Sequence, residues 1–167
     1  MRKSKQRKQW ALVNPITHAT FQASRLTVGE WNTQLTPVIA ALEAIQRGEW
    51  AVRENWTPLF YCLNRIESIL TLKKVDDQGL IDECQAVFVD ALERKESTGA
   101  TALKAKELET LRWMVTVYGD LLREISHGDF SRACNHTDAN MQRIVKSPPT
   151  HNTRRIGGMV IELEKFK

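Results

Sequence analysis

Three side chains that could bind a metal ion lie close together in the last third of the chain: His127, Cys134 and His136. Their H-x6-C-x-H spacing is accompanied by no C-x-x-C or H-E-x-x-H motif. On a helix, Cys134 and His136 point about 200° apart, so they cannot face one ion. We therefore expect no metal site and no cofactor. His127 is interpreted as a C-terminal residue of a helix, where a positive charge is favourable.

Motifs for catalysis are not found in the sequence. It contains no Walker loop, no G-x-S-x-G and no Cys/His pair at a suggestive spacing. Neighbouring carboxylates such as Asp82-Glu83 and Glu107/Glu109 are typical of solvated helix faces. We expect no catalytic residues and a protein that is not an enzyme.

Positive charge is concentrated at the two ends of the chain. Residues 1–10 carry a net charge of +5 and residues 146–167 carry +3, so residues 11–145 carry −4 within the total of +4. Lysine and arginine neutralise phosphates and release counterions, which favours nucleic acid without reading its sequence. Trp10 could stack on a base or lie against the body of the protein. The candidate nucleic-acid-binding residues are Arg2, Lys3, Lys5, Arg7, Lys8, Arg154 and Arg155. The alternatives are a solvated tail that aids solubility, or contact with an anionic protein or membrane surface.

A second candidate surface is the apolar strip Trp113, Val117 and Leu121. Trp113 points almost opposite the main apolar stripe of its helix. It either packs inside the protein, under a later helix or the N-terminal arm, or anchors a partner. A host or phage protein, or a second copy in a homodimer, would be that partner.

Trp113, Val117 and Leu121 lie on a predicted helix over residues 101–126. Its main stripe and the Trp113 strip together cover roughly 200° of the helix surface, so the helix needs neighbours on more than one side. We interpret it as the central helix of an all-α antiparallel bundle. The main stripe consists of Leu108, Leu111, Val115, Tyr118, Leu122 and Ile125.

The same periodicity predicts four main helices and a shorter fifth. A first helix starts with the capping box Thr27-x-x-Glu30 and either continues through Pro37 with a kink or restarts there. A second runs from Val52, a third ends at Gly99, the fourth stops at Gly128, and the fifth covers about 129–145. Residues 16–26 could form a short helix or an ordered arm. We expect a basic N-terminal arm (1–26), a helical bundle (27–146) and a C-terminal tail (147–167), with both tails flexible. In the tail, residues 159–161 could form a short strand or a docking segment.

The three cysteines, Cys62, Cys84 and Cys134, are odd in number and widely spaced, which indicates reduced thiols rather than a disulfide framework. The apolar run after the basic start is too short for a signal peptide, and no run is long enough for a membrane span. We expect a soluble, cytoplasmic protein with no membrane partner.

Residues 8–18, with Asn14-Pro15-x-x-His18 behind the basic start, and the later LNRIES and KELETLRWM stretches resemble a group of small uncharacterised proteins of bacterial phages and plasmids. The resemblance implies an accessory role in a mobile element. We therefore expect a non-enzymatic accessory protein that contacts nucleic acid non-specifically through its basic tails. The alternative is a protein-binding module, or an inhibitor of a host machine, that acts through a face of the bundle.

Overall fold

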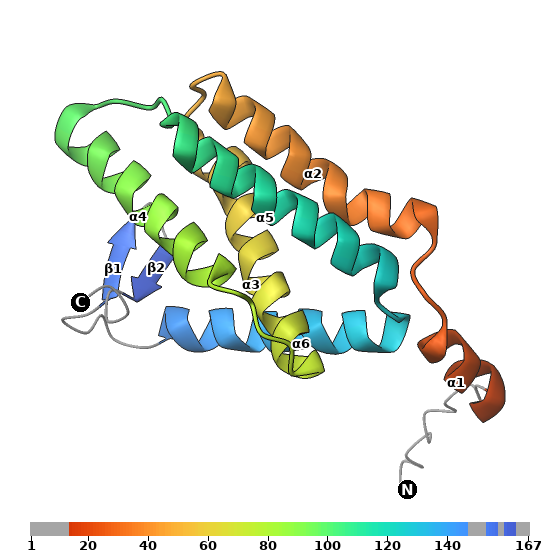
Figure 1. The fold of residues 1–167 in the computed structure, drawn as a ribbon. Helices are drawn as coiled ribbons and strands as arrows, with labels where there is room; N and C mark the ends of the chain where they lie inside the picture. The colour runs from red at the N-terminus through yellow and green to blue at the C-terminus, as the bar shows by residue number, and fades with distance from the viewer. Residues whose placement is uncertain (1–13, 147–152, 157–158, 163–167) are drawn as a thin grey trace, which may run out of the picture.

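The computed structural model describes residues 14–146, 153–156 and 159–162 (Figure 1). Its elements are α1 (Pro15–Ala23), α2 (Val28–Gln46), a π-helical turn η1 (Val52–Trp56), α3 (Thr57–Lys73), α4 (Leu80–Thr98), α5 (Ala105–Glu124), α6 (His127–Lys146), β1 (Thr153–Ile156) and β2 (Met159–Glu162). The expected helical fold is confirmed for residues 14–146. The two strands form an antiparallel hairpin in which Thr153 pairs with Glu162.

Local sequence signals determine several helix ends. The Thr27 side chain accepts a hydrogen bond from the Glu30 backbone, and the Glu30 carboxylate accepts one from the Thr27 backbone, which completes the predicted capping box of α2. The helix continues through Pro37, as the kinked alternative requires. Gly99 ends α4 with a φ of 76°, a left-handed conformation that glycine adopts without strain. Residues 16–26 include most of the short helix α1, one of their two predicted forms.

The predicted limits of the last two helices are wrong. Helix α5 begins after its N-cap Lys104 rather than at residue 101, and it ends at Glu124 rather than at Gly128. Ile125 leaves the helix because its backbone is extended, with ψ at 144°, and Ser126 next to it forms an isolated antiparallel bridge with Arg25. The last helix therefore begins at His127, and at 20 residues α6 is as long as α5 rather than shorter.

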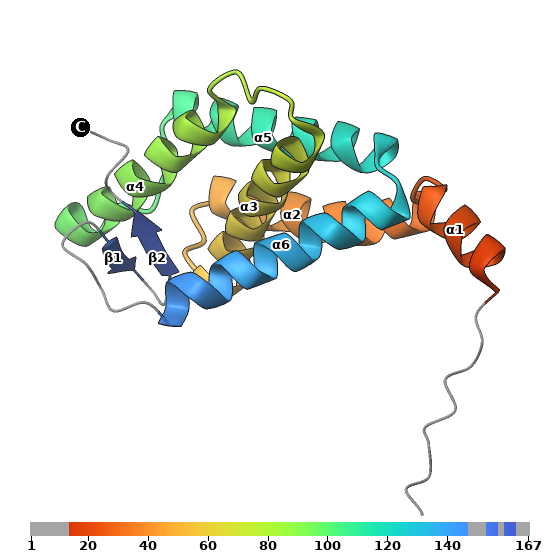
Figure 2. The same ribbon diagram turned by 90° about the horizontal axis from the view of Figure 1, so that it is seen from below.

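The arrangement differs from a simple bundle of four helices and a fifth. Helices α2 and α5 lie side by side and run in opposite directions (Figure 1). Helix α3 packs against α2, α4, α5 and α6, whereas α5 packs mainly against α2, α3 and α4. The central helix is thus α3 and not α5. Seen from below, α6 crosses over α3 and packs against it, and α1 projects at the edge (Figure 2).

The core is continuous through these helices. Trp56, Leu59, Ile66 and Ile69 from the η1–α3 segment are fully buried with Phe88 of α4. From α5, the predicted stripe residues Leu111, Tyr118 and Leu122 are also fully buried, whereas Leu108 and Val115 are half-buried at its edge. Since α3 contributes fully buried residues along its length, the core is built around it.

Candidate functional site

A group of polar side chains outside the core lies where α1, α2 and α6 meet. His127, the first residue of α6, reaches Ser24 after α1 and Glu30 in the first turn of α2. Its ring also packs against Phe21 of α1, with the ring centres 4.3 Å apart. We call His127, Ser24 and Glu30 the corner cluster. It joins residues about one hundred positions apart in the sequence.

Hydrogen bonds shift the pKa values of the two titratable groups in the corner cluster. Hydrogen bonds from the side chain and backbone of Thr27, and then from His127, lower the pKa of the Glu30 carboxyl to about 2. The Glu30 carboxylate and the Ser24 carbonyl, in turn, raise the pKa of His127 above its ordinary value. Both shifts favour the pair of carboxylate and imidazolium, whose closest atoms lie 3.0 Å apart.

A serine, a histidine and a carboxylate in contact are the residue types of a nucleophilic triad, so the partners of the two ring nitrogens matter. The His127 Nδ1 lies 2.9 Å from the Ser24 carbonyl and 3.1 Å from the Ser24 hydroxyl, and Nε2 lies 3.0 Å from Glu30. When both nitrogens are protonated, the ring donates to the carbonyl and the carboxylate and accepts no proton. The Ser24 hydroxyl donates to the Phe21 carbonyl of its own helix. In this charged state the ring cannot act as a general base toward Ser24.

A cleft of about 360 Å³ opens beside the corner cluster. Its walls are both aromatic and polar, and Glu30 and His127 form part of them. The lining residues are Phe21, Gln22, Leu26, Glu30, Thr33, Gln34, His127, Phe130 and Ser131.

The second histidine of the predicted H-x6-C-x-H group lies elsewhere. His136 contacts the buried Ser68 through Nδ1 at 3.0 Å, and Ser68 in turn contacts Thr137 at 2.9 Å. These contacts tie α6 to α3. Within the part of the chain that the structure describes, no group of His, Cys, Asp and Glu residues is arranged to hold a metal ion.

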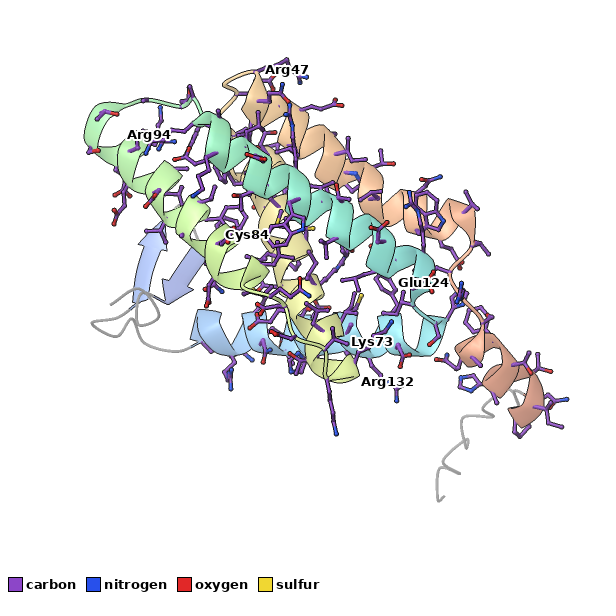
Figure 3. The ribbon with its side chains drawn as sticks, in the orientation of Figure 1. Arg47, Lys73, Cys84, Arg94, Glu124 and Arg132 are labelled. Atoms are coloured by element: carbon purple, nitrogen blue, oxygen red, sulfur yellow. The ribbon has the colours of Figure 1, made fainter. Side chains whose placement is uncertain are left out.

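The cysteines are not activated. Burial raises the pKa of Cys62 well above its ordinary value and that of Cys84 to about 12. Cys84 lies in the interior between the helices (Figure 3). Cys134 is half-buried, and partial burial raises its pKa too. Neutral thiols are weak nucleophiles and poor metal ligands.

The predicted protein-binding strip divides into two parts. Val117 and Leu121 are half-buried and pack against the core, whereas Trp113 is 38% exposed and is outside that packing. Neither α6 nor another described element covers Trp113 enough to bury it.

The predicted nucleic-acid-binding residues fall largely beyond the described structure. Arg2, Lys3, Lys5, Arg7 and Lys8 lie outside the described residues, as do Trp10 and most of the tail. Arg154 and Arg155 belong to strand β1, opposite Ile161 and Val160 of β2. The structure therefore brings no two of the basic candidates from opposite ends together among the residues it describes.

Two polar groups were missed by sequence reasoning. The capping box identified Glu30, but nothing local indicated that α1 and α6 are neighbours, so the corner cluster was not foreseen. Likewise Glu107, interpreted as part of a solvated face, is buried and binds both terminal nitrogens of Arg94 at 2.7 Å.

No described helix combines the length and apolar character that a membrane crossing requires. The chain matches no protein-family model, no curated protein and no solved structure.

Proposed function

We propose that this chain is a non-enzymatic, cytoplasmic accessory protein of a mobile genetic element that contacts nucleic acid non-specifically through its basic ends. The observation that carries the proposal is the separation of charge along the chain: residues 1–10 hold five positive charges and no acidic residue, beside a body of net −4 over residues 11–145. Phosphates attract the first segment and are repelled by the body, so contact is confined to the ends.

Ion pairs within the body support the same division. Several arginines of the helices and their connections are already paired with carboxylates, which leaves less free positive charge on the folded surface. These pairs are Arg25–Glu124, Arg47–Glu49, Arg94–Glu107, Arg123–Asp120 and Arg132–Asp129. Figure 3 shows Arg47, Arg94 and Arg132 at three separate edges of the molecule, so they do not form one basic surface.

Fluorescence anisotropy with labelled duplex DNA and RNA tests this proposal. The full chain is compared with a variant in which Arg2, Lys3, Lys5, Arg7 and Lys8 are replaced by glutamine. Five released counterions predict about a 500-fold loss of affinity for duplex DNA between 50 and 200 mM salt. The variant is expected to lose most of both the affinity and this salt dependence.

A matched control carries the same change of charge on the helical body. It replaces five exposed basic residues by glutamine: Arg53, Lys73, Lys74, Lys106 and Arg112. If the control loses as much affinity as the first variant, net charge rather than the N-terminal segment determines binding. If the unmodified chain binds neither nucleic acid at 50 mM salt, the proposal is wrong.

The alternative function is a protein-binding module, or an inhibitor of a host machine, that acts through α5. The exposure of Trp113 favours it, because large aromatic side chains at the surface are frequent anchors of interfaces. A homodimer through Trp113, Val117 and Leu121 is the simplest form of this alternative. Sedimentation of the full chain and of Trp113→Ala would show a dimer in the first and a monomer in the second.

A further inference from the structure

The cleft beside the corner cluster has an exposed aromatic side chain in its wall. Phe21 of α1 lines the cleft and packs against the His127 ring, yet Phe21 is still 52% exposed. An aromatic side chain contributes a large apolar area when another molecule covers it. The Phe21 ring therefore offers an apolar face to a molecule that enters the cleft.

Close contacts between α1 and α6 hold this wall in place. Helix α1 lies at the edge of the molecule and packs mainly against α6 (Figures 1 and 2). The His127 backbone N–H donates to the Ser24 carbonyl at 2.9 Å. A Cβ at Gly128 would lie 2.8 Å from the Gln22 side-chain oxygen, so glycine at this position lets α1 approach α6 closely. The cleft is therefore formed before any ligand arrives.

Polar side chains without partners line the rest of the cleft. The Arg65 guanidinium lies 6.0 Å from the centre of the Phe130 ring and donates to the Gln34 side-chain oxygen at 2.8 Å. This contact orients the Gln34 amide and leaves its NH₂ group to donate. Among the described residues, that NH₂ group meets no acceptor, and the side chains of Gln22 and Ser131 form no hydrogen bond. The cleft thus offers both donors and acceptors to a ligand.

The charges in the cleft favour a neutral ligand. No lysine or arginine is among the described residues that line it, and its carboxylate is that of Glu30. A phosphate inside the cleft would meet this carboxylate without a lysine or arginine to neutralise it. An organic cation gains little either, because Glu30 is already in contact with His127 at 3.0 Å. A flat neutral ring with polar edges fits the lining best, and about 360 Å³ is at the small end of ligand sites.

The basic N-terminal segment comes shortly before this cleft in the chain. Lys8 precedes Pro15, the first residue of α1, by a stretch that spans at most about 25 Å when extended. A strand whose phosphates contact the basic segment therefore has its bases within reach of the cleft. In a duplex the bases are paired and stacked inside the helix, whereas in a single strand they can turn outward.

We propose that this cleft receives one unpaired base of single-stranded DNA or RNA, which stacks on Phe21 while the basic N-terminal segment neutralises the neighbouring phosphates. The proposal rests on the nucleic-acid function proposed above and adds a preference for single strands to it. The Gln22 and Gln34 amides are hydrogen-bonding partners for the edge of the base. Every base has a face that can stack on an aromatic ring, so binding remains independent of sequence.

Fluorescence anisotropy of the full chain with three labelled probes tests the cleft. The probes are a single-stranded DNA of mixed sequence, a strand of the same length with abasic sites in place of its nucleotides, and a hairpin duplex. In Phe21→Ala, affinity for the single strand is expected to fall about 5- to 150-fold, the usual effect of removing one stacked base. Affinity for the abasic strand and for the duplex is expected to stay unchanged, because these probes contact only the basic segment.

Two further variants separate stacking from a change in α1. Ile16→Ala removes an apolar side chain that is 77% exposed on the same helix but outside the cleft, and it is expected to change no affinity. Phe21→Tyr keeps the aromatic ring and is expected to keep the affinity for the single strand. Circular dichroism checks that each variant retains its helical content.

The outcomes distinguish the cleft from the proposed function. If Phe21→Ala binds the single strand as tightly as the unmodified chain does, the cleft is not a base site, and the proposed function stands. An equal loss of affinity for all three probes would also overturn the cleft, because Phe21 would then act through the basic segment. If the unmodified chain binds none of the three probes, both proposals are wrong.

Discussion

Glu107 is a carboxylate that the fold removes from water almost completely. Burial raises the pKa of the Glu107 carboxyl, but hydrogen bonds from Arg94 and from the Lys104 backbone outweigh it, so the pKa lies below its ordinary value. The Arg94 fork binds both carboxylate oxygens at 2.7 Å and also donates to the Ala102 carbonyl. This pair therefore fastens the end of α4 and the following loop to the first turn of α5.

Removing the Glu107 carboxylate should destabilise the folded protein. Glu107→Ala leaves Arg94 and the Lys104 N–H without their acceptor, so the free energy of unfolding is expected to fall by about 2–4 kcal/mol. Urea denaturation measures the loss, and Glu109→Ala, at an exposed neighbouring position, is the control, with an expected change within about 0.5 kcal/mol. Equal losses in the two variants would contradict a specific role for the pair.

Protonation of Glu107 in acid should remove the stabilisation that its pair with Arg94 provides. Because the folded pKa of Glu107 is lowered from 4.5, its stabilisation is complete above that pH and is lost as pH falls through the folded value. The unmodified chain should therefore lose more stability between pH 5 and acid than Glu107→Ala does. Parallel stability curves for the two proteins would show that Glu107 does not titrate as described.

The role of a residue could be predicted from the sequence only where it depends on residues nearby in the chain. The Thr27–Glu30 capping box was readable because it depends on two residues three positions apart. The position of His127 was not, because its interpretation as a helix C-terminus rested on a pattern that continued to Gly128, whereas the backbone turns at Ile125. Its partners Ser24 and Glu30 come from helices that no local pattern connects to α6.

Among the helices, α5 shows how much periodicity can predict. The apolar stripe of α5 correctly identified Leu111, Tyr118 and Leu122 as core residues. Periodicity measures how wide a buried face is, but it does not tell which helices cover that face. For this reason the periodicity predicts α5 as the central helix, although α3 contacts more of the other helices.

Two glycines on consecutive helices should respond oppositely to the same substitution. A Cβ at Gly119 of α5 would lie at an ordinary distance, 3.4 Å, from the nearest Leu35 methyl group, so Gly119→Ala should stabilise the chain by about 0.5–1 kcal/mol through helix propensity. At Gly128, the Cβ would also lie 3.1 Å from the Gln22 carbonyl, so Gly128→Ala should displace α1. Thermal unfolding measures the first effect and α1 amide protection the second. Destabilisation by Gly119→Ala would mean that α5 and α2 pack more tightly than described.

For the molecule as a whole, the thiols report on packing between α3, α4 and α6. Cys62 and Cys84 are buried and protonated, whereas Cys134 on α6 is half-buried. At pH 8, iodoacetamide should modify Cys134 first, and the other two only when the protein unfolds. Mass spectrometry of the native chain, with Cys134→Ser as the control, gives the order. Early modification of Cys62 or Cys84 would contradict the buried α3–α4 contact.

The contact between α1 and α6 also has a consequence during synthesis of the protein on the ribosome. Ser24 and His127 are 103 residues apart, so α1 leaves the ribosome long before its main partner has been synthesised. Throughout that interval the basic N-terminal segment is joined to a helix with no docking surface. A nascent chain that stops before α6 therefore carries the positive charges of the N-terminal segment but lacks the contacts between His127 and Ser24.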